Sequence, residues 1–171
     1  ELKDILQMDT SEYLHVIVTR DPVTRWLSAY SEHQRHCNDF FKGHRVPPPM
    51  SMLSQIVEWA ENGDKTISTD TKYVHMRPQV DYMSPNSLYL PLEALGDASL
   101  EVQAIDGTRL LKGPVFKSNG FSNAKKGFAH AAELERMKTG DLKEETRALV
   151  HRAYGKDVSL HEKTLQTKHA I

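Results

Sequence analysis

The sequence predicts an α/β fold in which a short parallel sheet is flanked by helices. The first observation is an apolar strand followed directly by a helix, over residues 13–35. The second is another apolar strand at residues 87–90, and the third is a pair of amphipathic helices at residues 52–60 and 142–154. The 171 residues suit a single domain, residues 1–171, which is long enough to bury a core without disulfide or metal support.

The first strand and helix are joined by a tight turn. Residues 13–19 read Tyr-Leu-His-Val-Ile-Val-Thr, an apolar and β-branched run that is typical of a buried parallel strand. Arg20 follows the strand and Asp21 can cap the next helix. Pro22 suits the first helical position, where a missing N–H group costs nothing. The helix is expected to end at about Arg35.

The first amphipathic helix follows a proline-rich loop. Residues 46–49, Val-Pro-Pro-Pro, must take an extended conformation, because each proline ring fixes φ and removes an N–H group. Apolar residues then recur with helical spacing over residues 52–60. Ser51 is the expected N-cap, and Gly63 stands just beyond the expected end.

The second amphipathic helix covers residues 142–154. Asp141 and Glu144 resemble a capping box at its start, and Gly155 follows its expected end. A shorter helix is expected from about residue 92 to residue 100, directly after the strand at residues 87–90.

The composition excludes several classes of protein. The chain has 22 Lys and Arg against 23 Asp and Glu, so a strongly basic nucleic-acid binder is not indicated. No apolar run reaches the roughly 18 residues that a membrane-spanning helix needs, and no signal peptide opens the chain. The single cysteine, Cys37, cannot form an internal disulfide, which favours a reducing compartment and a cytoplasmic protein.

The turn after the first strand is the strongest candidate for an anion site. Arg20 leaves the carboxyl end of the strand beside a helix N-terminus, where a guanidinium and free N–H groups can bind a phosphate. Arg25 and Ser28 are three residues apart on one helical face and could reach the same anion. The alternative for Arg20 is an ion pair with Asp21.

The pattern Arg20-Asp-Pro-x-x-Arg25-x-x-Ser28-Ala-Tyr30 resembles a known signature. It is similar to the 3′-phosphate-binding signature of the sulfotransferases that use 3′-phosphoadenosine 5′-phosphosulfate (PAPS), most of all in the carbohydrate sulfotransferase branch. The resemblance implies that Arg20 and Ser28 hold the 3′-phosphate of PAPS, with Arg25 as a support or an added contact. It also implies the sulfotransferase variant of the phosphate-loop nucleotide-binding fold.

Other segments resemble the same family in the same order along the chain. Residues 75–79, His-Met-Arg-Pro-Gln, are similar to its His-x-x-Pro-Gln segment. Residues 88–95 resemble its strand-to-helix stretch, and residues 148–158 resemble its terminal helix followed by Tyr-x-x-Asp and an apolar residue. Ser118 lies where the family has a loop that reaches the nucleotide phosphate, and is a further candidate for binding the cofactor.

The chain departs from the family pattern in two ways. The family begins with a strand and a loop rich in Lys, Gly and Ser or Thr that binds the 5′-phosphosulfate, whereas residues 1–10 read as a helix without glycine. We therefore expect an N-terminally truncated form of the fold. The loop then belongs to a longer chain, comes from another chain, or has been lost together with activity. Tyr82 and Met83 stand where Golgi members usually carry disulfide cysteines, which again favours a cytoplasmic protein.

Sulfuryl transfer needs a base that takes the proton of the acceptor hydroxyl. His75 is the expected base, because an imidazole titrates near neutral pH, and Arg77 could steer an anionic substrate. The alternative is that His75 is a loop residue bonded to a carbonyl. Within the first strand, His15 is more typical of a core histidine.

A metal site is the weaker interpretation of a group of histidines near Cys37. His33, His36 and His44 could join Cys37 as zinc ligands, but no second cysteine pair exists and no metal is expected. The reaction implied by the resemblance also needs none, since its leaving group is a stabilised phosphate.

Three functions remain open at the level of sequence. The first is a PAPS-dependent sulfotransferase that acts on a hydroxyl of a small molecule or saccharide. The second is another phosphate-binding enzyme, such as a nucleotide kinase, which lacks the Gly-x-x-x-x-Gly-Lys-[Ser/Thr] motif. The third is a non-catalytic sulfotransferase-fold module that binds a nucleotide or a glycan. The sequence fixes neither the acceptor nor the oligomeric state.

Overall fold

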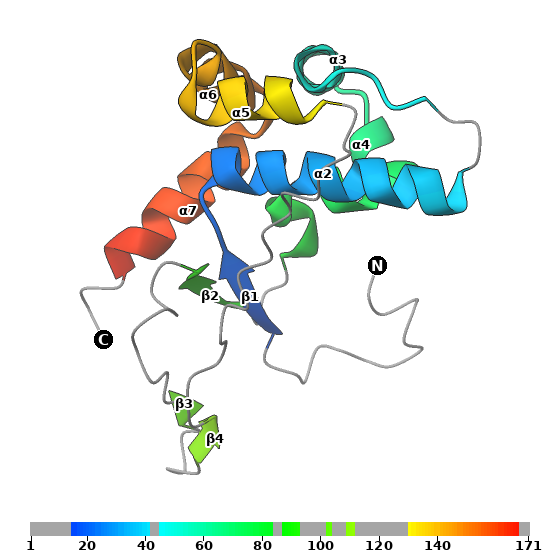
Figure 1. Ribbon diagram of the computed structural model, residues 1–171. Helices are drawn as coiled ribbons and strands as arrows, with labels where there is room; N and C mark the ends of the chain where they lie inside the picture. Colours follow the sequence, from blue (N-terminus) through cyan, green and yellow to red (C-terminus); the bar gives the residue numbers. More distant parts are fainter. Residues whose placement is uncertain are drawn as a thin grey trace.

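The computed structural model in Figure 1 confirms the predicted fold class, because a short parallel sheet is flanked by helices. The residues that the structure describes are 15–41, 45–83, 87–92, 102–103, 109–111 and 130–167. Among them, no helix combines the length and the apolar character that crossing a membrane requires. The helices predicted for residues 1–10 and 92–100 lie outside the described residues, apart from Leu92.

Within the described residues, the sheet that carries the candidate site has two strands. β1 (His15–Thr19) and β2 (Ser87–Pro91) pair in parallel, with Ile17 opposite Tyr89. Both predicted strands are therefore confirmed over the described residues. A separate antiparallel ladder joins β3 (Val102–Gln103) to β4 (Arg109–Leu111).

The helix after β1 starts as the sequence predicts. α2 (Pro22–Phe40) has proline as its first residue, and the side chain of Asp21 caps it by accepting a hydrogen bond of 2.8 Å from the Thr24 N–H group. The helix continues past Arg35, the predicted end. The turn beyond Arg35 contributes Cys37 to the core, where it is fully buried, whereas Phe40 at the end is exposed.

The next helix begins earlier than predicted. α3 (Pro49–Glu61) includes the last proline of the proline-rich loop as its first residue, a position that needs no N–H group. Ser51 is therefore inside the helix, and the N-cap is Pro48, which makes no side-chain cap. Gly63 lies just beyond the end, as predicted, with a positive φ of 69° that favours glycine.

Three short helices connect α3 to β2, and the sequence analysis did not predict them. They are α4 (Thr66–Thr69), and the 3₁₀ helices η1 (Thr71–Met76) and η2 (Gln79–Tyr82).

Three helices follow near the end of the chain, and the sequence predicted only the middle one. They are α5 (Ala131–Thr139), α6 (Lys143–Ala153) and α7 (Gly155–Thr167). Gly155 follows the end of α6, as predicted, and is also the first residue of α7. The predicted capping box, however, is wrong: the N-cap of α6 makes no side-chain hydrogen bond, and Asp141 pairs with Arg136 at 2.7 Å.

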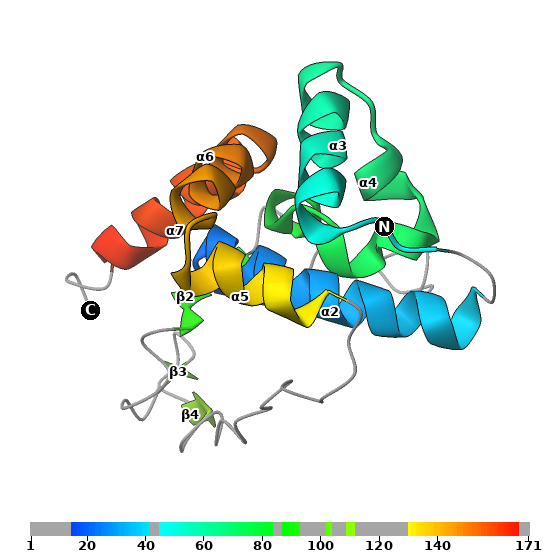
Figure 2. The ribbon, with the colours of Figure 1, turned by 45° about the horizontal axis from the view of Figure 1, so that its top comes forward.

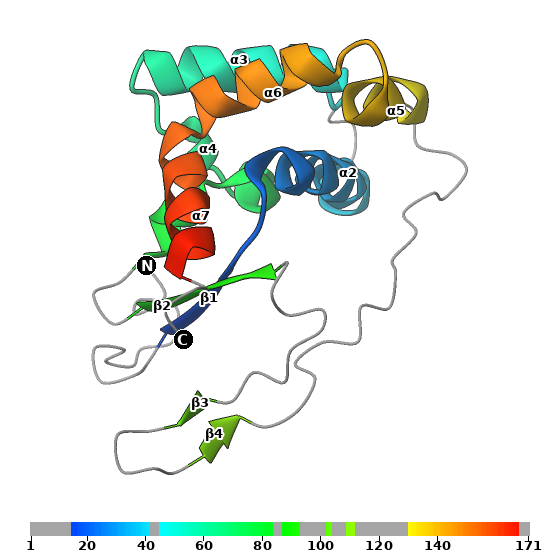
Figure 3. The same ribbon diagram turned by 90° about the vertical axis from the view of Figure 1, so that its left-hand side faces the viewer.

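The core lies between α2 and the helices that cover it. α3 and α6 pack side by side over one face of α2 (Figures 2 and 3). α7 lies against the sheet and the start of α2 (Figure 3). The largest fully buried apolar side chains are Trp26, Tyr30, Met52, Leu53, Ile56, Met76, Met137 and Val150. This packing fixes the position of α2, and with it the turn that begins the helix.

Candidate functional site: the turn between β1 and α2

Arg20 occupies the turn between β1 and α2, where the sequence places it. Its guanidinium forms no hydrogen bond or ion pair within the part of the chain that the structure describes. In particular it does not pair with Asp21, whose carboxylate accepts hydrogen bonds from the N–H and hydroxyl groups of Thr24. Arg20 is partly buried, so its side chain stands at the surface of the turn rather than in the core.

The carboxylate of Asp21 adds a negative charge to the start of α2. Burial raises the pKa of Asp21, but the hydrogen bonds from Thr24 and the charges of His161 and Arg147 lower it, and the net shift is downward. The Thr24 N–H group is thus already bound. An anion at this turn would therefore be bound by side chains more than by the main-chain N–H groups of the helix start.

Ser28 lies two helical turns beyond Asp21, on the same face of α2 and about 10 Å further along the axis. The side chain is partly buried, and its hydroxyl makes no hydrogen bond to any residue that the structure describes. Arg20 and Ser28 are therefore two polar groups without a protein partner, within this described part, at one end of one helix.

Arg25 is engaged by the protein itself. Its Nη2 lies 2.6 Å from the Oδ2 atom of Asp157, and its Nη1 donates to the Arg77 carbonyl at 2.8 Å. The guanidinium also lies over the ring of Tyr154, 5.2 Å from the ring centroid. Only 15% of the Arg25 side chain is exposed. These contacts tie α2 to α7, and they give Arg25 a supporting role in the turn.

Asp157 is the centre of this network and is buried to 1% exposure. Besides Arg25, it accepts hydrogen bonds from two main-chain N–H groups, of Gln79 at 2.8 Å and of Val80 at 3.0 Å. Burial raises the pKa of Asp157, while Arg25 and the two N–H groups oppose that rise by favouring the ionised carboxylate. Asp157 therefore joins α7, η2 and α2.

The side chain of Gln79 extends the network to β1. Its Nε2 donates to the Val18 carbonyl at 2.9 Å, and its Oε1 accepts a longer hydrogen bond of 3.4 Å from the Arg20 N–H group. The sequence did not predict Gln79 or Asp157 as residues of the site. Both stand in segments that carry the family resemblance, and an acidic residue directly before the apolar Val158 was the available signal.

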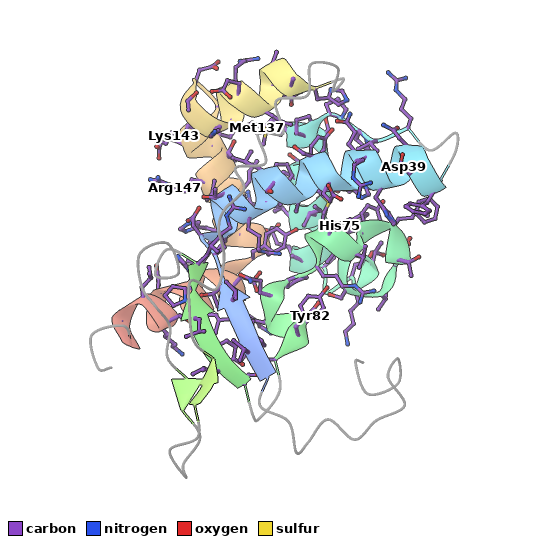
Figure 4. The ribbon with its side chains drawn as sticks, turned by 60° about the horizontal axis from the view of Figure 1, so that its bottom comes forward. Asp39, His75, Tyr82, Met137, Lys143 and Arg147 are labelled. Atoms are coloured by element: carbon purple, nitrogen blue, oxygen red, sulfur yellow. The ribbon has the colours of Figure 1, made fainter. Side chains whose placement is uncertain are left out.

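The structure does not bring His75 to the turn. His75 lies in η1, and its ring packs edge-to-face against His36 with 5.2 Å between the ring centroids. Figure 4 shows His75 beside α2, whose far end is marked by Asp39. Along the helix axis, His36 is roughly 24 Å from Arg20. Burial lowers the pKa of His75, and nearby Glu32 partly offsets this.

The remaining candidates divide into described and undescribed residues. Ser118 and His44 lie outside the described residues, as does the side chain of His15. His33 is buried, and its Nδ1 is 2.8 Å from the Lys72 carbonyl. Among the described residues, no three or more His, Cys, Asp or Glu side chains gather where they could hold a metal ion.

A comparison with known protein families matches residues 2–163 to the sulfotransferase family. The chain belongs to the sulfotransferase family. The match spans the turn, α2, Gln79 and Asp157, so the whole network lies inside the sulfotransferase region. Neither a curated protein nor a solved structure matches the chain.

Membership of the sulfotransferase family indicates the general chemistry of the candidate site. Members of the sulfotransferase family are transferases that move a sulfuryl group from a sulfate donor to an acceptor, and the match supports that chemistry for this chain. A sulfate donor carries several negative charges. The site that receives it must therefore supply cationic groups and hydroxyl donors, which are the groups found at the start of α2.

Proposed function

We propose that this sulfotransferase transfers a sulfuryl group from PAPS to a hydroxyl of a carbohydrate, and that Arg20 and Ser28 bind the 3′-phosphate of PAPS. The observation that carries the proposal is the contrast between two arginines of one turn. Arg25 is held by the buried Asp157, whereas the Arg20 guanidinium has no partner within the described residues. An arginine left in this state at the end of a parallel strand is suited to an external anion.

The charges around the turn support the same proposal. Arg147 lies close enough to Asp21 to lower its pKa, so α6 brings a further guanidinium to the end of α2 where Arg20 stands. Figure 4 shows Arg147 at this end. A 3′-phosphate would meet the Arg20 guanidinium and the Ser28 hydroxyl, and Arg147 would offset the negative charge of Asp21.

The proposal is tested by calorimetric titration with adenosine 3′,5′-bisphosphate. Arg20→Ala should weaken binding by about tenfold or more, because charge-assisted hydrogen bonds contribute about 1.5–3 kcal/mol. Ser28→Ala should weaken it less, because a neutral hydroxyl contributes about 1 kcal/mol. Arg35→Ala is the matched control, since Arg35 is exposed on the same helix and pairs with Glu32 and Asp39. Unchanged affinity in Arg20→Ala would remove the assignment.

The choice of nucleotide separates this proposal from a kinase. Adenosine 3′,5′-bisphosphate should raise the melting temperature, and ATP with magnesium should not. A protein that binds the bisphosphate but transfers no label from radiolabelled PAPS to saccharide hydroxyls would be a non-catalytic binding module.

His75 lies toward the other end of α2 from Arg20, so its position does not support a role at the turn. We propose it as the base on chemical grounds alone, because an imidazole can take the proton of a hydroxyl near neutral pH. His75→Ala should leave the affinity for the bisphosphate unchanged and abolish transfer of the label. Transfer that persists in His75→Ala would assign the base to another residue.

A further inference from the structure

We propose that Gln79, held in place by Asp157, is a positioning residue that sets the direction of Arg20 toward the 3′-phosphate; this rests on the proposed function. Gln79 does not touch the proposed ligand in this account. It acts on the main chain that carries Arg20. The contacts run from β1 to α2 through residues far apart in the sequence.

The first step is the carboxamide of Gln79, which bonds the main chain on both sides of Thr19. It donates to the Val18 carbonyl at 2.9 Å and accepts from the Arg20 N–H group at 3.4 Å. In a parallel sheet, a residue of the neighbouring strand bonds in this way to the two peptide groups that flank the residue opposite it. The side chain of Gln79 therefore takes the place of a strand where β1 ends.

The second step is the main chain of Gln79, which cannot move independently of α7. The N–H groups of Gln79 and Val80 both donate to the carboxylate of Asp157, at 2.8 and 3.0 Å. Asp157 is buried, and hydrogen bonds to a charged acceptor are about twice as strong as neutral ones. The Gln79 carboxamide is thus held at a fixed position beside β1, because its main chain is anchored to Asp157.

The third step is the link from Asp157 to α2. The same carboxylate binds Arg25, which lies on the first turns of α2. The turn that contains Arg20 is therefore held from its β1 side by Gln79 and from its α2 side by Arg25, and both holds meet at Asp157. This leaves the Arg20 side chain as the part of the turn that is free to meet a ligand, within the described residues.

The consequence is specific to the 3′-phosphate. Loss of the carboxamide frees the main chain at Arg20, and a guanidinium that no longer points at its anion loses the directional part of its hydrogen bonds. Contacts elsewhere on the nucleotide would not depend on the direction of this guanidinium. The preference for a ligand with a 3′-phosphate should fall, while binding of the same ligand without that group should not.

The experiment compares adenosine 3′,5′-bisphosphate with adenosine 5′-monophosphate, which differ only in the 3′-phosphate. The ratio of their dissociation constants is measured for the wild-type protein and for Gln79→Leu. We expect the ratio to fall about tenfold in Gln79→Leu, with the affinity for the monophosphate within about twofold of wild type. Gln79→Glu keeps an acceptor for the Arg20 N–H group but loses the donor to Val18, so we expect a smaller fall.

A matched control separates positioning from general destabilisation. Ile56→Val removes a methyl group from the buried face of α3, away from the turn, and should lower the melting temperature without changing the ratio. If Gln79→Leu fails to fold, Gln79→Glu carries the test. A wild-type preference that both Gln79 variants retain would overturn the positioning role alone. A wild-type protein with no preference for the bisphosphate would overturn the proposed function as well.

Discussion

Arg20 and Arg25 are the same residue type, five positions apart, and their surroundings give them opposite roles. Arg25 faces a buried carboxylate and a tyrosine ring, so its charge is paired inside the protein. Within the described residues Arg20 has no such partner. The chemistry of a guanidinium is identical at both positions, so the difference comes from which residues the rest of the chain brings against each one.

This difference predicts unequal effects on stability. Arg25→Ala leaves the buried Asp157 without its cation, and we expect it to lower the free energy of unfolding by about 3 kcal/mol or more. Arg35→Ala removes an exposed arginine whose pairs with Glu32 and Asp39 lie in solvent, so we expect a much smaller loss. Urea denaturation at neutral pH measures both. Equal losses would contradict a structural role for the Arg25 pair.

At the scale of elements, the start of α2 follows local chemistry, whereas its end depends on packing. Asp21 and a following proline are sufficient to begin α2, and the sequence predicts that start correctly. The same helix continues to Phe40 because the turn that contains Cys37 is buried in the core. Gly155 marks the end of α6 and is also the first residue of α7. The local sequence does not show that a new helix begins there.

The packing of η1 on α2 predicts a dependence of stability on pH. Burial lowers the pKa of His75 below its ordinary value of 6.5, with Glu32 opposing and His36 and Arg35 adding to the shift. The unfolded chain then binds a proton at a higher pH than the folded one does. Stability should therefore fall as the pH drops below about 6.5.

The measurement is the urea midpoint of unfolding at pH 7.5 and at pH 5.5. His75→Gln, which cannot titrate, should show a smaller loss between the two values than the wild-type protein. An equal loss in both proteins would assign the pH dependence to other groups.

At the scale of the whole molecule, the turn joins elements from most of the described chain. β1, α2, η2 and α7 meet at Asp157 and Gln79, so a ligand bound at the turn should stabilise the entire fold. At a concentration one hundred times its dissociation constant, a ligand adds about 2.7 kcal/mol. For a protein of this size, that corresponds to a rise of roughly 5–10 °C in melting temperature.

Differential scanning fluorimetry with adenosine 3′,5′-bisphosphate checks this expectation. At the same ligand concentration, the rise should fall to about half or less in Arg20→Ala, because binding is about tenfold weaker or more, and it should be retained in Arg35→Ala. An undiminished rise in Arg20→Ala would show that the ligand binds elsewhere on the protein.

The amino-acid sequence by itself determined the strand, the turn and the helix as far as Arg35, and it placed Arg20 in the turn, because strand pattern, helix cap and proline act over a few neighbouring residues. It also carried the family signature. Only the tertiary structure decided that Arg25 is the arginine held by the protein, and that Gln79 supports the end of β1. Arg25 and Asp157 are 132 positions apart, and a contact across that separation exists only once the helices have packed.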